Sequence, residues 1–152
     1  MKTSKLVGVM ALLVQIGSAV AFVLSIMTVY GVLTSALGGG MMFQMEVDQT
    51  TGAGTLALEL QPSNPGVLDA DFSFGLSLLD SEGEPVASDS GSLSLTAGGS
   101  GTLNLVLEVP REDFERIYNE GESSLEISVS LRTLYDLVGI SDTFTIPQGG
   151  QR

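Results

Sequence analysis

Residues 6–37 form a run of 32 residues without a charged side chain, and this run constrains the fold more than any other feature. At about 1.5 Å per helical residue it would extend to about 48 Å, more than the roughly 30 Å hydrocarbon core of a bilayer. We therefore predict a transmembrane helix over residues 6–29 and a neck over residues 30–37. Lys2 and Lys5 precede the helix and Tyr30 follows it. These flanks predict a cytoplasmic N-terminus and an extracellular C-terminal domain.

A cleaved signal peptide is the alternative interpretation of the same segment. Lys2 and Lys5 would form its basic region, residues 6–16 its apolar core, and residues 19–21 a small-residue cleavage site ending at Ala21. Against cleavage after Ala21, the apolar run continues beyond this point, so a mature chain would begin with an exposed apolar segment. We therefore expect an uncleaved signal anchor in the cell membrane, with the lipid bilayer as its partner.

Small side chains recur every four residues within the predicted helix, at Gly17, Ala21 and Ser25. This spacing lets two helix backbones approach closely in a membrane. One interpretation is helix packing in a homo-oligomer or against a membrane-protein partner. The other is that small residues are simply common in membrane helices.

The chain after Gly40 is strongly acidic. All 18 Asp and Glu residues lie there, with only four arginines and no lysine, so this part carries a formal charge of −14. Such a surface repels nucleic acid and anionic lipid, which argues against both as partners of this part. The loss of lysine together with the gain of acidic residues resembles the proteins of extremely halophilic archaea. An ordinary secreted domain kept soluble by its charge is the alternative.

The residue types needed for several kinds of catalysis are missing. The chain has no Cys and no His, which excludes disulfides, thiolate or His-ligated metal sites and His-based triads. Asp80, Glu82 and Glu84 alternate across a glycine turn and are weak Ca²⁺ candidates, but their spacing falls short of a calcium loop. A solvated acidic turn is the favoured interpretation. We expect no enzyme activity, no cofactor and no metal.

From residue 41 onward, apolar and polar residues alternate as in half-buried β-strands. A brief helix is predicted after Pro110, because acidic residues follow the proline and residues 114, 117 and 118 form one apolar face. A connection is predicted at residues 134–140. Strands are predicted at residues 41–47, 56–60, 70–78, 86–88, 93–95, 103–109, 125–131 and 143–146. Seven or eight short strands predict a mainly β fold, an antiparallel fibronectin- or immunoglobulin-like β-sandwich behind a transmembrane helix.

The predicted organisation has four parts. Residues 1–37 form the anchor helix and neck, residues 38–40 a glycine hinge, residues 41–147 the β-sandwich and residues 148–152 a polar tail. Three consecutive glycines favour a flexible connection, whereas a tight turn into the first strand is the alternative.

Several motifs in residues 58–147 resemble the water-stress and hypersensitive-response domain of the group-two late embryogenesis abundant proteins, in its archaeal membrane-anchored form. They are Asn64-Pro65 after a leucine-alternating strand, the amphipathic strand at residues 68–78, Pro85-Val86-Ala87-Ser88, the turn at residues 95–100, the strand ending in Val109-Pro110, the short helix at residues 112–118, and Thr145-Ile146-Pro147. The resemblance implies a fibronectin-like sandwich and a link to dehydration or osmotic stress. It implies no catalytic residues.

These observations predict a non-enzymatic, single-pass membrane protein with an extracellular binding or structural module of the cell envelope. One alternative is a repeating subunit of an envelope layer or filament packed through its apolar helix. Another is an accessory subunit of a membrane complex.

Overall fold

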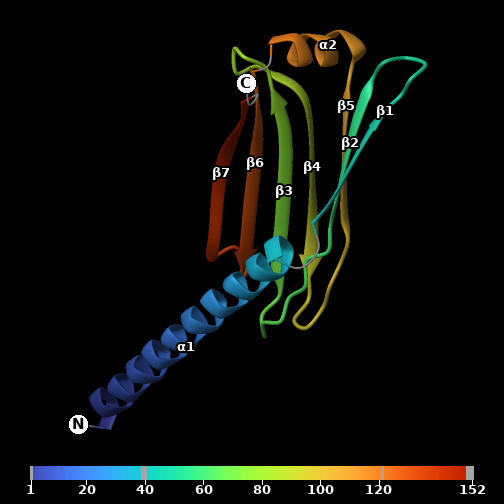
Figure 1. Ribbon diagram of the computed structural model, residues 1–152. Coiled ribbons are helices and arrows are strands. Elements are labelled where there is room, and N and C mark those ends of the chain that lie inside the picture. The colour runs from blue at the N-terminus through green and yellow to red at the C-terminus, as the bar shows by residue number, and fades with distance from the viewer. Residues whose placement is uncertain (1, 39–40, 121, 150–152) are drawn as a thin grey trace.

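A computed structural model describes residues 2–38, 41–120 and 122–149 of the chain (Figure 1). A long helix comes first, seven strands follow, and a short helix lies between the fifth and sixth strands. In chain order the elements are α1 (Lys2–Gly38), β1 (Met42–Val47), β2 (Gly54–Leu60), β3 (Ala70–Leu79), β4 (Pro85–Leu95), β5 (Leu103–Val109), α2 (Arg111–Glu120), β6 (Glu122–Thr133) and β7 (Val138–Gly149).

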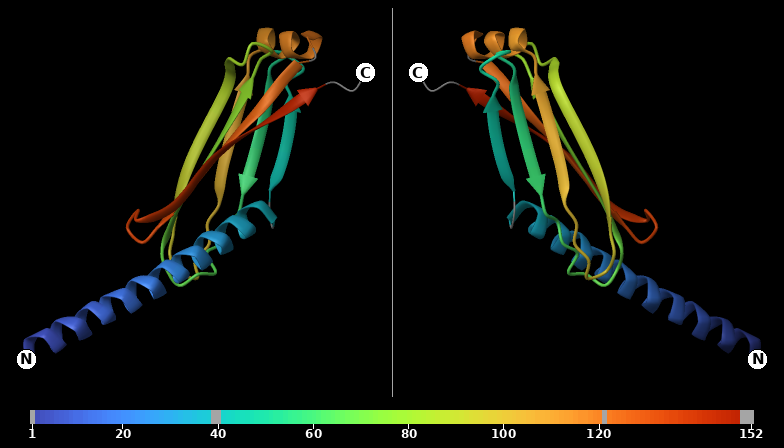
Figure 2. Two further views of the ribbon diagram at one scale, coloured as in Figure 1. Left: turned by 90° about the vertical axis from the view of Figure 1, so that its left-hand side faces the viewer. Right: turned by 90° about the vertical axis from the view of Figure 1, so that its right-hand side faces the viewer.

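The strands form two antiparallel sheets, one with the order β1-β2-β5 and one with the order β4-β3-β6-β7. The predicted β-sandwich behind an apolar helix, with one short helix, is therefore confirmed. All chain reversals lie at the two ends of the sandwich. α1 contacts one end and α2 covers the other (Figures 1 and 2).

The core lies between the inner faces of the two sheets, and β3 supplies its centre. Phe72, Phe74 and Leu76 alternate with polar residues along β3 and are fully buried. Leu58 and Leu60 of β2 and the alternating leucines of β5 face them from the other sheet. Burying a side chain of this size contributes roughly 1.5–3 kcal/mol.

One edge of the sandwich is closed by contacts between the two sheets, and the other edge is open. At one edge β4 lies against β5, and Asp89 of β4 accepts a hydrogen bond at 2.8 Å from the backbone N–H of Val106 in β5. At the other edge, β1 and β7 end their sheets. Their inner faces stay open to solvent.

Two strand predictions were wrong in extent. β4 is one strand from Pro85 to Leu95 and not two short strands, because Asp89 and Gly91 occupy inner positions where an apolar residue was expected. Leu103 packs over Gly91 and would lie 2.6 Å from a Cβ there. β7 begins at Val138, so the predicted connection shrinks to a tight turn. The strand also reaches Gly149, beyond the predicted start of the polar tail.

α1 is one continuous helix that leaves the sandwich obliquely, as Figure 2 shows from two sides. Its first half stands free, and its second half lies against the sandwich end. The predicted neck is therefore the docked second half of a helix, packed into the core cluster through Val32 and Ala36. Of the predicted glycine hinge, Gly38 ends α1, and residues 39–40 lie outside the described residues.

Candidate functional site

The second half of α1 docks through one face. Ser25, Thr28, Val32 and Ala36, spaced three or four residues apart, are all fully buried. This spacing places them on the same side of a helix. The helix and the sandwich therefore share one apolar core.

The docking partner of α1 is the loop between β2 and β3. Ser63 of this loop donates its backbone N–H to Ser35 Oγ at 2.6 Å, and the two hydroxyl oxygens lie 2.8 Å apart. A Cβ on Gly31 would lie 2.6 Å from Pro65 Cγ, and a Cβ on Gly66 would lie 2.8 Å from Thr28 Cα. Both glycines are therefore needed for the close approach of helix and loop.

Asn64 holds this loop in shape. Its side chain is buried and donates to the carbonyl oxygens of Leu68 at 2.7 Å and Leu95 at 3.1 Å, while its Oδ1 accepts from the Gly66 N–H at 3.0 Å. Its backbone also pairs with Gly98 and Gly99 in the next loop. A single buried amide thus ties two loops and β4 into a platform for the helix.

The first half of α1 has no such partner among the described residues. The stretch Val7–Gly38 is long and apolar enough to cross a membrane, and the most apolar part of it is unburied. Burial of one face begins at Ser25, which lies against the sandwich, while the opposite face stays exposed at Ile26, Met27 and Tyr30. Residues 7–24 would extend about 27 Å, close to the thickness of a bilayer core. Docking of α1 on the sandwich thus begins at Ser25, inside the predicted membrane span of residues 6–29.

The predicted helix-packing residues lie in different surroundings along α1. Gly17 lies on the free half and is open on all sides, whereas Ser25 is buried and donates its hydroxyl to the carbonyl of Ala21 at 2.7 Å. Tyr30 is exposed on the docked half. Lys2 and Lys5 lie in the first turns of α1, and their side chains are outside the described residues.

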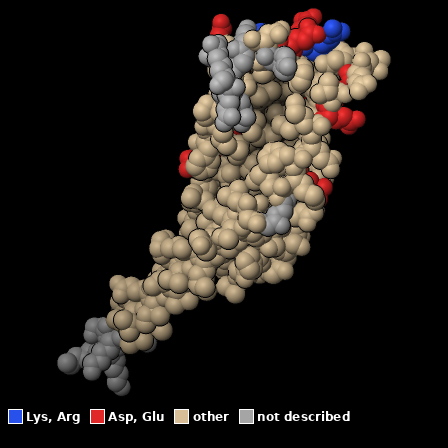
Figure 3. Space-filling model, in the orientation of Figure 1, with Lys and Arg blue, Asp and Glu red and all other residues tan. Residues whose placement is uncertain are grey.

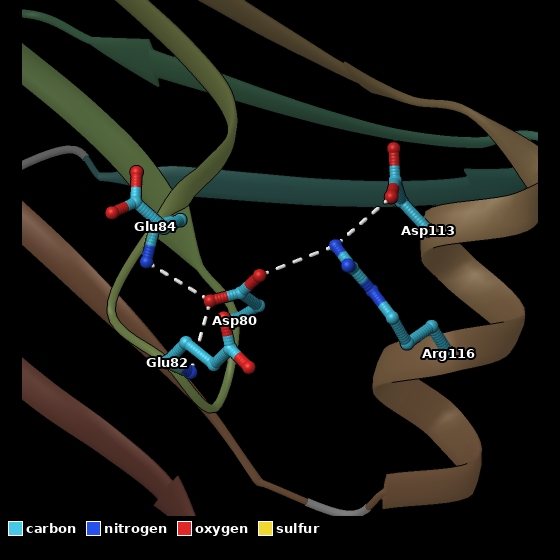
Figure 4. A network of polar contacts seen from close by, with 5 residues as sticks. All are labelled: Asp80, Glu82, Glu84, Asp113 and Arg116. Carbon is cyan, nitrogen blue, oxygen red and sulfur yellow. Dashed lines mark hydrogen bonds and ion pairs between the residues drawn. The ribbon is translucent and has the colours of Figure 1, made fainter.

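The acidic turn between β3 and β4 is an ordinary capped turn joined to α2 (Figure 4). Asp80 is 8% exposed, and its Oδ1 accepts the backbone N–H groups of Glu82 at 3.0 Å and Glu84 at 2.9 Å. Its Oδ2 lies 3.3 Å from Nη2 of Arg116, which also contacts Asp113 at 3.0 Å. The Asp80 carboxylate is thus occupied by protein donors. Within the described ranges, no group of three Asp or Glu side chains is placed to hold a metal ion.

Two further charged groups at the same end are tuned by neighbours. The backbone N–H of Thr50 and the hydroxyl of Thr51 hydrogen-bond the carboxylate of Asp48 and lower its pKa below the ordinary value. The hydrogen bond and charge of Glu115 raise the pKa of Arg111. Both effects stabilise charged forms on the surface.

The outer face of the four-stranded sheet is lined by small hydroxyl side chains, which the sequence analysis did not single out. Two adjoining open hollows of about 420 and 540 Å³ lie over it. The strand pairing brings together Ser73, Ser77, Ser88, Ser90, Ser92, Ser94, Ser128, Ser130 and Ser141 on this face. The signal in the sequence is the alternation of serine with apolar residues in β3, β4 and β6.

The open edge of the sandwich carries an apolar surface that we call the β1/β7 edge. Its six side chains belong to inner faces, because each pairs across its sheet with an inner-facing position. They are nevertheless 44–69% exposed. The six residues are Phe43, Met45, Val47, Ile140, Phe144 and Ile146. This edge is a candidate interface.

Charge is distributed unevenly between the two ends of the sandwich. On the face seen in Figure 3, charged side chains gather at the α2 end, and the α1 end is almost free of them. The end near α2 carries Asp48, the three acids of the β3–β4 turn and the charged side chains of α2 itself. The turns near α1 hold only Asp69 and Asp136.

Comparison with known proteins yields structural likeness only. No family model matches the chain, and no curated protein matches it. A β-glucuronidase of glycoside hydrolase family 2 aligns with 72% of this chain at 14% identity and a TM-score of 0.47, and this chain spans 11% of that enzyme. A family 2 glycosyl hydrolase from Bacteroides cellulosilyticus aligns with 72% at 13% identity and a TM-score of 0.45, spanning 14% of that chain. A protein from Archaeoglobus fulgidus aligns with 71% at 10% identity and a TM-score of 0.44, over 91% of its length. At these values none of them carries a functional argument.

Proposed function

We propose that the protein is a single-pass membrane protein whose β-sandwich acts outside the cell as a non-enzymatic binding or structural module. The observation that carries this proposal is the free half of α1, an apolar helix of about one bilayer thickness that continues directly into the helix half docked on the sandwich. A helix exposed in this way is unfavourable in water and favourable in lipid.

Cleavage after Ala21 competes with this proposal. The chain beyond that residue would keep the docked half of α1, but Phe22, Val23, Ile26 and Met27 would remain at least half exposed. Four large apolar side chains at a free helix end are costly in water. Retention of the anchor leaves these residues next to lipid.

The orientation can be tested by cysteine labelling, because the chain contains no Cys. Glu82→Cys places one thiol at the α2 end of the sandwich, and Ser4→Cys places one before the membrane helix. In intact cells, a membrane-impermeant maleimide should label the first variant, and it should label the second only after lysis. The reverse pattern overturns the proposal. The mass of the membrane-extracted chain, 15.8 kDa when intact, reports loss of residues 1–21 in the same sample.

A narrower proposal concerns the setting. The resemblance to the water-stress domain and the acidic composition support a role in the envelope at low water activity, in a halophilic organism. The hydroxyl-lined sheet face presents many hydrogen-bonding groups to water without bulky apolar side chains. A deletion strain should then survive drying or a salt upshift less well than the parent, and equal survival counts against the stress role.

Self-assembly in the membrane is a second candidate function, favoured by the β1/β7 edge. Anchored copies share one orientation, and both edge strands lie on the same open side of the sandwich. Two copies could therefore cover these apolar side chains mutually, as edge strands often do when left unprotected. Such pairing of edges supports the alternative in which the protein is a repeating subunit of a cell-envelope layer or filament.

Matched variants separate this candidate from a monomeric module. Met45→Glu with Phe144→Glu charges the inner face of the edge, whereas Gln44→Glu with Thr143→Glu charges the outer faces of the same strands. Cross-linking in native membranes should show oligomers for the wild type and the second pair, and monomers for the first pair. A wild-type chain that never cross-links to itself contradicts assembly.

A further inference from the structure

The turn between β6 and β7 carries apolar side chains where they gain nothing for folding. Tyr135 is 98% exposed and Leu137 is 78% exposed. The turn is closed by a hydrogen bond of 3.1 Å from the Leu137 N–H to the Leu134 carbonyl. Neighbouring exposed apolar side chains that folding does not bury are a feature of contact sites with proteins or membranes.

The backbone of this turn is also costly. Leu134, Tyr135 and Asp136 have φ values of 55°, 54° and 65°, so three consecutive non-glycine residues are left-handed. Each left-handed residue with a Cβ costs about 1–2 kcal/mol, and Gly or Asn would suit these positions better. Strain kept in this way points to a role for the side chains themselves.

The tip lies at the end of the sandwich that meets the membrane helix. Thr133 at its base donates its hydroxyl to the Asp69 carbonyl at 2.6 Å, which joins the tip to the loop that holds α1. Both β6 and β7 contact α1. In Figures 1 and 2 the turn projects toward the side on which the free half of α1 leaves the sandwich. When that half crosses the bilayer, its oblique exit tilts the tip toward the lipid.

Charge at this end permits contact with lipid. Arg132 lies 3.9 Å from Asp136 and offsets the single charge of the tip. The Asp69 carboxylate accepts the backbone N–H of Ala97 at 2.9 Å. Val67 adds a third exposed apolar side chain in the neighbouring loop. Tyrosine, with an apolar ring and a polar hydroxyl, is the residue type that membrane interfaces favour.

We propose that the β6–β7 turn inserts Tyr135 and Leu137 into the outer interface of the bilayer, so that the sandwich rests on the membrane in a fixed orientation. This inference rests on the proposed function, because it requires the free half of α1 to span the same bilayer. With the turn inserted, the sandwich holds its acidic α2 end away from the lipid and keeps the β1/β7 edge at a constant distance from the bilayer surface.

Tryptophan reporters test the proposal, since the chain has no Trp. Three full-length variants, Tyr135→Trp, Phe22→Trp and Glu82→Trp, are reconstituted into phosphatidylcholine vesicles with or without brominated acyl chains. We expect brominated lipid to quench the tip reporter and the helix reporter, with a blue-shifted emission for both, and to leave the reporter at the α2 end unchanged. Leu137→Trp serves as a second tip reporter and should behave like the first.

The outcomes distinguish the two proposals. Quenching of the helix reporter without quenching of either tip reporter overturns the seating of the tip and leaves the membrane anchor intact. An unquenched helix reporter overturns the anchor, and the seating with it. Equal quenching at the tip and at the α2 end would indicate a collapsed or unfolded domain on the lipid, which circular dichroism of the same samples would reveal, and it would also overturn the seating.

Discussion

The docking of α1 on the sandwich can be tested by a designed disulfide between Ser35 and Ser63. Their hydroxyl oxygens lie 2.8 Å apart, and the residues are 28 positions apart in the chain. The chain has no other Cys that could compete. In Ser35→Cys with Ser63→Cys, the bond should form on oxidation of the folded protein without added catalyst.

The size of the effect follows from loop closure. Closing a loop of 28 residues removes chain entropy worth about 3–4 kcal/mol from the unfolded state. The substitution also removes two hydrogen bonds of Ser35 Oγ, worth about 1 kcal/mol each. The net gain in unfolding free energy over the wild type is therefore about 1–2 kcal/mol, or roughly 2–8 °C in Tm for a chain of 152 residues.

The assay compares the oxidised variant with the wild type in detergent micelles, with Tm read by circular dichroism and the crosslink read by gel mobility. Ser35→Cys with Ser88→Cys is the control, because Ser88 lies on the outer face of β4 and should not reach the helix. Equal crosslinking in both pairs, or none in the first, would contradict the docking of α1 on the sandwich.

Three further predictions concern single residues. Gly31→Ala should lower Tm, since its Cβ would meet Pro65 Cγ at 2.6 Å, whereas Gly17→Ala, with open space around it, should keep Tm or raise it through better helix propensity of about 1 kcal/mol; a lower Tm for both refutes the close contact. Thr28→Val should stabilise by about 1–2 kcal/mol in urea unfolding, because the buried Thr28 hydroxyl has no hydrogen-bond partner among the described residues, and a loss of stability would show that this hydroxyl is satisfied. The lowered pKa of Asp48 means that its contribution is present above the ordinary pKa and is lost as pH falls through the folded value. Urea midpoints of wild type and Asp48→Asn should therefore differ above about pH 4 and converge as the pH falls below it, and a constant difference contradicts the role of the carboxylate.

The fold class could be predicted because most strands keep a strict period of two. β3 was placed almost to the residue, since Phe72, Phe74 and Leu76 alternate with polar residues and are fully buried. The full length of β4 could not be predicted because two of its inner positions are not apolar. Asp89 accepts a backbone N–H of β5, and Leu103 packs over Gly91. Tertiary partners replaced the apolar pattern there, and no local pattern reports such partners.

The candidate site was harder to predict for the same reason. The apolar run revealed a membrane helix, but its length alone could not tell lipid contact from protein contact. The boundary between lipid contact and protein contact depends on contacts of Thr28, Gly31 and Ser35 with a loop 28–38 positions away. The left-handed turn at residues 134–136 was equally hidden, because Leu-Tyr-Asp carries none of the Gly or Asn that signal such a backbone. Small residues in the second half of α1 are, in retrospect, the sign of docking.

The docked face of α1 also limits how its small residues can serve oligomers. Gly17 and Ala21 lie four-residue steps before Ser25, so they continue along the membrane span the same helix face that Thr28 and Val32 press against the sandwich. A second helix packed on Gly17 and Ala21 would thus stand beneath the sandwich, on the side toward which the β6–β7 turn projects in Figure 2. A second helix packed on this face would occupy the position that the β6–β7 turn needs for the proposed insertion of Tyr135 into the bilayer. Association through the β1/β7 edge has no such conflict, because it leaves that face of α1 to lipid, and it is therefore the mode of assembly that is compatible with a seated domain.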